Sequence, residues 1–220
     1  MMKPFLPLLL SATLLAACGG TPPPDWKLNA VSLLENAQQR WLEGDSKSAD
    51  LALTRARNEI AKSGRIDLLA RAELAACAAR IASLDFAPCA AFEKQAPDAG
   101  AGDKAYAQFL AANWDGLDAK ALPPHYADLV AARDAAGANR AVAEIKSPLP
   151  RLIGAALLFH AGRATPETLG IAVDTASERG WRRPLLAWLE VQHKRAQTSG
   201  DNEAARILRK RIDFVLGNPQ

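Results

Sequence analysis

The sequence predicts an all-α protein, and three observations support this class. Apolar residues recur at the three- and four-residue spacing of amphipathic helices along most of the chain. Runs that alternate β-branched with polar residues, as half-buried strands do, are absent from the sequence. Alanine, the strongest helix former, is abundant throughout. With 220 residues, 49% hydrophobic and 23% charged, the chain is long enough for one sizeable core or two small ones.

Turn and cap residues divide this pattern into successive helices. Gly44 ends the first helix and Asp45 caps the second, while Pro124, Pro166 and Pro184 suit first helical turns. A segment rich in Ala, Gly and Asp at 97–103 marks a candidate boundary within the helical domain. The run "LIGAALLFHAG" is too short to span a bilayer and predicts a buried helix. The predicted helices cover about 28–43, 46–62, 66–83, 104–113, 123–136, 139–146, 151–161, 166–179, 184–198 and 202–216.

The first and last helix pairs resemble tetratricopeptide repeats. In "AQQRWLEGDSKSADLALTRARNEI", Ala37 and Trp41 precede the Gly-Asp turn, and Ala49 and Ala56 follow it seven residues apart. The last pair repeats Trp, Gly-Asp and Ala in "LLAWLEVQHKRAQTSGDNEAARILRKRIDFVLGNP". The two turn glycines are 156 residues apart, which is not a whole number of units of about 34 residues.

The resemblance implies antiparallel hairpins stacked as a degenerate repeat solenoid, with a concave groove that holds a peptide or a partner helix. Ile212 replaces the second alanine of the last pair, and Ser46 and Asn202 stand where an aromatic residue is usual. The alternative is a generic helical bundle, in which the alanines merely allow two helices to approach closely.

The N-terminus carries an export signal. Lys3 precedes an apolar or small run from Phe5 to Ala17, which is typical of a secretory signal and too short to span a bilayer. The tetrapeptide Leu-Ala-Ala-Cys ending at Cys18 resembles the lipobox of bacterial lipoproteins. The alternatives are an ordinary signal peptide with a chance cysteine, or a short anchor helix.

The lipobox resemblance implies that residues 1–17 are removed and that Cys18 carries a diacylglycerol and an N-acyl chain. Residues 18–26, with "GGTPPP", then form a lipidated tether, and residues 27–220 form the helical domain. Lipoproteins of this kind that are kept in the inner membrane tend to have Asp after the cysteine. Gly19 stands there, so the resemblance implies the periplasmic face of the outer membrane.

Cys77 and Cys89 are the two remaining cysteines. An exported protein lies in an oxidising compartment, and a turn near residue 84 would bring the two cysteines level, so we expect a disulfide. The alternative is two buried free thiols. No metal site is expected, because neither cysteine has nearby histidine partners in the sequence.

The sequence carries no catalytic signature, so we expect no enzyme. His125, His160 and His193 are scattered, and no metalloprotease helix, nucleophile elbow or phosphate-binding loop is present. His160 lies in an apolar run and is expected to be a core residue. No cofactor is expected beyond the acyl chains on Cys18. An enzyme would require one of these histidines to share a cleft with acidic groups.

The C-terminal third is basic. From Arg179 to Arg211 there are nine Lys or Arg against three acids, a net of +6, whereas 85–118 has two lysines against six acids, a net of −4. Such a segment suits an acidic partner, anionic headgroups or a glycan, and the alternative is a solvated helix face. The candidate partner contacts are Trp41, Trp181, Arg182, Arg183, Trp188, Arg206, Arg209, Lys210 and Arg211.

Two functions fit these patterns. The first is a lipid-anchored, non-catalytic scaffold or adaptor that binds a protein partner at the bacterial envelope. The second is a module that binds peptidoglycan or activates a wall enzyme. Nucleic acid is not expected as a partner, because the chain is exported and its net charge is only +3.

Overall fold

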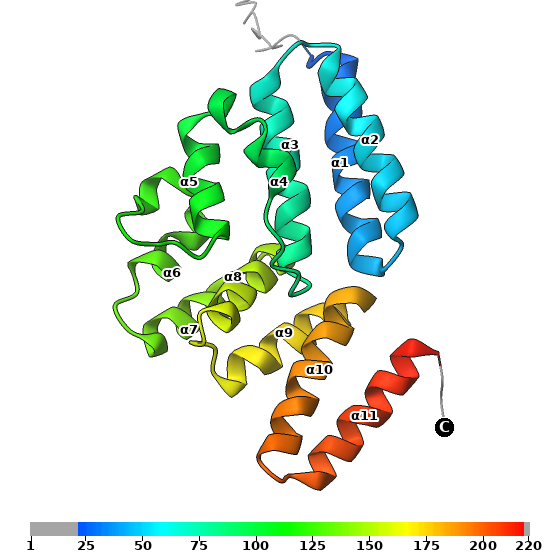
Figure 1. Cartoon of the computed structure of the whole chain (residues 1–220), viewed down its shortest axis with the longest axis vertical. Helices are drawn as coiled ribbons and strands as arrows, with labels where there is room; N and C mark the ends of the chain where they lie inside the picture. The colour runs from blue at the N-terminus through cyan, green and yellow to red at the C-terminus, as the bar shows by residue number, and fades with distance from the viewer. Residues whose placement is uncertain (1–21, 218–220) are drawn as a thin grey trace, which may run out of the picture.

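The computed structural model describes residues 22–217, and this part of the chain is all-helical, with no strand. Figure 1 shows α1 to α3 side by side at one end of the molecule, α10 and α11 at the other, and α8 and α9 between them. The α-helices are α1 (Asp25–Glu43), α2 (Ser46–Ala61), α3 (Ile66–Ile81), α4 (Ala90–Glu93), α5 (Ala101–Leu110), α6 (Ala127–Ala131), α7 (Ala135–Glu144), α8 (Pro148–His160), α9 (Pro166–Glu178), α10 (Arg182–Thr198) and α11 (Asn202–Leu216).

The predicted boundaries agree with most of these helices. Gly44 adopts the left-handed conformation (φ 97°) that ends α1, and the Asp45 side chain accepts from the Ser48 N–H to cap α2. The helix expected at 123–136 is instead a 3₁₀ turn, η3 (Pro124–Tyr126), followed by α6 and a break, after which Asp134 caps α7. Two short elements were not predicted, η1 (Ala96–Asp98) and η2 (Ala119–Ala121). The sequence also predicts a helix that begins near Cys89 and runs antiparallel to the one before it, and the structure has only the four-residue α4 there.

The helical domain begins slightly earlier than predicted. Helix α1 starts at Asp25, so the tether expected at 18–26 ends by Pro24 in the described residues. Asp25 lies in the first turn, where its negative charge favours the positive end of the helix dipole. The expected signal peptide and Cys18 lie outside the described residues.

One hydrophobic core runs through the described chain. Its main cluster includes Leu42 of α1, Leu74 of α3, Leu157 of α8 and Ile212 of α11, all buried. Phe92 and Phe109, on either side of the candidate boundary at 97–103, belong to the same cluster. That boundary therefore does not separate two cores.

Helix α8 is the centre of this core, as its apolar run predicted. All seven residues from Leu152 to Leu158 are buried, so the helix is covered on every side. Gly154 allows α6 and α7 to approach, because a Cβ at this position would lie 3.2 Å from methyl groups of Leu129 and Val142.

Helix α1 contacts both its hairpin partner α2 and a helix from near the other end of the sequence. The N-terminal hairpin α1–α2 packs through buried alanines, including Ala37, Ala49 and Ala56, as predicted. However, α1 also contacts α10 directly, although most of the chain separates them. In a solenoid each repeat contacts only its neighbours, so these hairpins are not arranged as a simple linear stack.

Candidate functional site

Helix α11 packs against α10 through a narrow apolar face. Gly200 (φ 74°) makes the turn between the two helices, and the Asp201 side chain accepts from the Ala204 N–H to cap α11. Ala205 and Ile212 are buried and half-buried Leu208 packs beside them, at the spacing of one helix face. The rest of α11 is free to face outward or into a groove.

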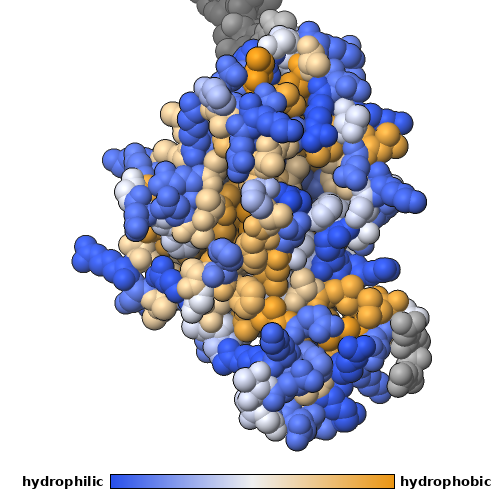
Figure 2. All heavy atoms as spheres, in the orientation of Figure 1, coloured by the Kyte–Doolittle hydropathy of each residue, from blue (hydrophilic) through white to orange (hydrophobic). Residues whose placement is uncertain are grey.

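A second face of α11 is exposed and combines two apolar with two basic side chains. We call these residues the outer stripe: Ile207, Lys210, Arg211 and Phe214. These residues follow the i, i+3, i+4, i+7 spacing of one helix face. Phe214 is 70% exposed and Ile207 47% exposed. Figure 2 shows apolar surface gathered at the end of α11, surrounded by hydrophilic side chains. Such a patch on a polar surface is typical of an interaction site.

The outer stripe forms one wall of a groove between α9, α10 and α11. The opposite side is lined by Ser177 of α9 and by Leu185 and Leu189 of α10, and the hollow measures about 640 Å³. Its lining is thus apolar on the α10 side, and it also includes Arg206, Lys210 and Arg211 of α11.

The basic residues of α11 divide into two groups. Arg206 pairs with Glu203 at 2.6 Å and Arg209 pairs with Asp213 at 2.9 Å, both within the helix. Lys210 and Arg211 form no ion pair with any residue of 22–217. Of the four predicted basic contacts on α11, Lys210 and Arg211 are the two whose charge is not neutralised by an ion pair within residues 22–217.

Two tryptophans proposed as partner contacts are instead core residues, so that part of the prediction is wrong. Trp188 is fully buried, and its Nε1–H donates to the Ala82 carbonyl at 3.3 Å. Trp181 is only 5% exposed, and its Nε1–H donates to Gln39 Oε1 at 3.1 Å. Both indoles satisfy their polar atom inside the molecule, which leaves neither available to a partner.

Trp41 and Arg183 contact each other, and Trp41 also lines a hollow between α1, α2 and α3. The Arg183 guanidinium lies 4.0 Å from the centre of the Trp41 ring, a cation–π contact. Its Nε donates to the Trp41 carbonyl and its Nη2 to Ser46 Oγ, both at 2.7 Å. This pair, which we call the hairpin clamp, fastens α10 to the α1–α2 turn. Neighbouring Arg182 is exposed.

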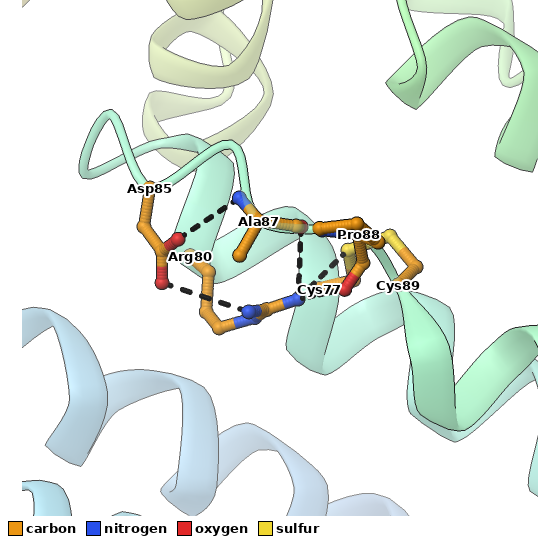
Figure 3. Close-up of a disulfide and its surroundings, with 6 residues drawn as sticks. All are labelled: Cys77, Arg80, Asp85, Ala87, Pro88 and Cys89. Carbon is orange, nitrogen blue, oxygen red and sulfur yellow. Dashed lines mark hydrogen bonds and ion pairs between the residues drawn. A yellow bond between two sulfur atoms is a disulfide. The ribbon is translucent and has the colours of Figure 1, made fainter.

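Cys77 and Cys89 are joined by a disulfide, with their Cα atoms 5.7 Å apart (Figure 3). After α3 the chain turns at Leu84 (φ 62°) and returns beside the helix, as a short extended segment rather than a second long helix. Arg80 holds this segment, since its Nη2 donates to the Ala87 and Pro88 carbonyls at 3.3 and 3.1 Å (Figure 3). The disulfide is thus a structural fastening of the return segment to α3.

The three histidines differ in their surroundings. His160 is exposed rather than a core residue as predicted, and it stacks on Phe86 with ring centroids 4.3 Å apart. His193 lies 3.9 Å from Glu190. His125 and Asp103 share a hollow, the arrangement that an enzyme would require, and both carboxylate oxygens of Asp103 accept hydrogen bonds from Arg71. Within residues 22–217 no group of three metal-ligating side chains comes together.

The sequence pointed to the basic end of α11 but missed its apolar side. The signal was present, because Ile207 and Phe214 are seven residues apart and Lys210 and Arg211 lie between them. Ala205 and Ile212 form a competing stripe on the same helix. Which of the two stripes faces the core depends on the packing of α11 against α10, and a local sequence pattern does not specify that packing.

The chain was compared with protein-family models, curated proteins and solved structures, and none of them matches. A helix long and apolar enough to cross a membrane is not found in the described part of the chain. The groove on α11 and the N-terminal sequence pattern are therefore the two features that bear on function.

Proposed function

We propose that this protein is a lipid-anchored, non-catalytic adaptor that binds a protein partner of the bacterial envelope in the α9–α11 groove. The observation that carries the proposal is Phe214, a large apolar side chain left 70% exposed on the last helix beside two basic residues without an ion-pair partner in residues 22–217. As part of this proposal the helical hairpins resemble tetratricopeptide repeats, a class of hairpin that commonly binds peptides or helices.

The groove favours an amphipathic segment with acidic residues. An apolar helix face that lies in a hydrophobic groove removes both surfaces from water, at about 25 cal/mol per Å² of apolar area. Acidic side chains on the partner would meet Lys210 and Arg211, which raises the association rate and fixes the register. Arg206 and Arg209 contribute less, because Glu203 and Asp213 already neutralise them.

In the proposal, the anchor holds the start of α1 near the membrane, and the groove lies at the opposite end of the molecule (Figure 1). In the proposal, the acyl chains on Cys18 hold the protein on the periplasmic face of the outer membrane. Two or more chains give firm attachment, because each buried methylene contributes about 0.8 kcal/mol. The partner is then a protein of the envelope that the anchored molecule can reach on its tether of a few residues.

The test is site-specific photocrosslinking in the native membranes, with the crosslinking residue at position 214. We expect one dominant envelope protein, crosslinked through a segment that is both apolar and acidic. The yield should fall at least tenfold when Lys210 and Arg211 are both changed to Glu, and remain in Arg209→Ala, the matched control with an already paired arginine. A Cys18→Ala chain should also lose the crosslink if anchoring brings the two proteins together.

The same unpaired charges also suit peptidoglycan, which is the second candidate function. Binding to purified sacculi that is lost in Lys210→Glu/Arg211→Glu but unchanged in Phe214→Ala would favour a wall-binding module. Loss of binding to the crosslinked protein in both variants, with no binding to sacculi, would favour the adaptor. A wild-type chain that crosslinks no protein at position 214 would overturn the adaptor proposal.

A further inference from the structure

The large apolar side chains that are exposed in residues 22–217 gather in two places. Three of the seven belong to α11. Three others lie in the first two turns of α1 and at the start of α3: Leu28 (53% exposed), Val31 (51%) and Ile66 (48%). We call these three residues the N-terminal patch. The seventh side chain, Leu51 on α2, is 54% exposed and lies outside both groups.

A small apolar cluster holds the helix ends that carry the patch. Ala30 of α1, Ile60 of α2 and Ala72 of α3 pack together, separately from the main core. The start of α1, the end of α2 and the start of α3 therefore lie at one end of the molecule, opposite α11 (Figure 1). Figure 2 shows apolar surface at this end among hydrophilic side chains. The N-terminal patch is thus a feature of the end at which α1 begins.

The charges at this end balance. The nearby helix turns carry three bases and three acids: Lys27, Lys62, Arg65, Asp25, Glu59 and Asp67. Lys62 pairs with Glu59 at 2.7 Å, and Arg65 pairs with Asp67 at 2.6 Å. A charged partner would meet no net opposite charge here, unlike on α11. The patch therefore suits a surface that is recognised by apolar contact.

The chain that leads into α1 limits what the patch can reach. Pro24, directly before α1, has an extended backbone (φ −63°, ψ 148°). The seven residues 18–24 span at most about 25 Å. Helix α1 alone is about 28 Å long, and α11 lies beyond its far end (Figure 1). An acyl anchor on Cys18 would therefore keep the N-terminal patch close to the membrane and α11 away from it.

We propose that the N-terminal patch lies against the lipid bilayer and orients the anchored protein, with the α9–α11 groove turned away from the membrane. This inference rests on the anchor of the proposed function and not on its protein partner. The anchor makes contact between patch and bilayer intramolecular, so three half-exposed side chains are sufficient at the resulting effective concentration. Apolar side chains of this kind enter the boundary between headgroups and acyl chains. Because the charges balance, the contact does not require anionic lipid.

The test uses the chain that begins at Cys18, coupled through this thiol to a maleimide phospholipid in phosphatidylcholine vesicles. Cys18 is the free thiol of that chain, because Cys77 and Cys89 form a disulfide. A photocrosslinking residue is placed at position 28, or at position 51 as the equally exposed control, and lipid adducts are measured by mass spectrometry. We expect about fivefold more phospholipid adduct at position 28 than at position 51. Position 214 should give no more than position 51, although Phe214 is 70% exposed.

Val31→Gln/Ile66→Gln separates contact driven by the patch from mere proximity to the tether. The lipid adduct at position 28 should fall about threefold in this variant and be unchanged in the matched control Leu51→Gln. All three changes are at exposed positions, and glutamine is a good helix former, so the fold is retained. Addition of phosphatidylglycerol should leave the yield at position 28 unchanged.

Four outcomes would each overturn the proposal. They are equal adducts at positions 28 and 51, more adduct at position 214 than at 28, an unchanged yield in Val31→Gln/Ile66→Gln, and a contact that requires phosphatidylglycerol. Failure of the proposed function is seen separately. The absence of acyl chains on Cys18 in cells, or of a protein crosslink at position 214, would contradict the anchored adaptor without changing the result in vesicles.

Discussion

Phe214 lies in an environment opposite to its chemistry, because it has no polar atom and is 70% exposed. This exposure of apolar surface to water costs free energy in the isolated molecule. A partner that covers Phe214 would remove that cost, which is why Phe214 anchors the groove proposed above.

The burial of the two tyrosines predicts an unusual alkaline titration. Burial raises the pKa of Tyr106 from 10.0 to about 12 and raises that of Tyr126 well above its usual value. These are the only two tyrosines of the chain, so the tyrosinate absorbance reports on them alone. We expect the folded protein to show almost no tyrosinate at pH 10, whereas the urea-unfolded chain is half ionised there.

The sign of the stability change follows from the same shift. Between pH 10 and about 12 the unfolded chain loses its phenolic protons before the folded one, so the free energy of unfolding falls as the pH rises. Below pH 10 the contribution is fully present. Half-ionised tyrosines in the folded protein at pH 10 would contradict the enclosed geometry of this cluster.

At the scale of elements, the disulfide fastens a segment that has little helix of its own. The return from α3 contains only the four-residue α4, and half-buried Cys89 ties it to buried Cys77. We expect Cys77→Ala/Cys89→Ala to lose about 3 kcal/mol of unfolding free energy in urea, because the bond restricts the unfolded chain. Wild-type protein measured with reductant should show the same loss, and no shift on reduction would indicate two free thiols.

Substitutions at two helical glycines should change the free energy of unfolding in opposite directions. Gly170 in α9 has open space around it, so Gly170→Ala should raise the unfolding free energy by about 0.5–1 kcal/mol through helix propensity. Gly154 in α8 lies against Leu129 and Val142, so Gly154→Val should lower it by about 1–3 kcal/mol. Thermal unfolding of both variants checks the pair, and a tolerated valine at 154 would mean that α6 and α7 can move apart.

The helices were predictable because their signals are local. Gly44, Asp45 and Asp201 act on the few residues beside them, and the uniformly apolar run of α8 can only be covered on all sides. Pro124 predicts the start of one continuous helix, and the local pattern does not reveal the break before Asp134. The helix predicted to begin near Cys89 is only four residues long, a length that periodicity does not specify.

The candidate site was only partly predictable, for a different reason. Basic charge on α11 can be counted in the sequence, but the burial of Trp181 and Trp188 depends on contacts with Gln39 and Ala82, more than 100 residues away. The spacing of Ile207 and Phe214 was visible too. Which stripe faces water depends on the packing of α10 and α11.

At the scale of the whole molecule, the hairpin clamp joins the first hairpin to the last. Arg183 packs on the Trp41 ring and donates two hydrogen bonds to residues at the α1–α2 turn. Trp181, two residues earlier, bonds to Gln39 of α1. This junction joins α1, the helix that follows the proposed membrane anchor, to α10, which lines the proposed groove.

The clamp therefore predicts that its removal loosens both ends of the chain while leaving the centre intact. Arg183→Ala should lower the unfolding free energy by about 2 kcal/mol, because it removes a half-buried cation–π contact and leaves the Trp41 carbonyl without its charged donor. Arg183→Lys should recover little, since an ammonium cannot make the same forked contact. Hydrogen exchange should become faster in α1 and α10, with α8 unchanged.

Arg182→Ala, the exposed neighbour, should stay within about 0.5 kcal/mol of wild type. If Arg183→Ala exchanged like Arg182→Ala, the two hairpins would be held together by the shared core alone, and the link from anchor to groove would not depend on the clamp.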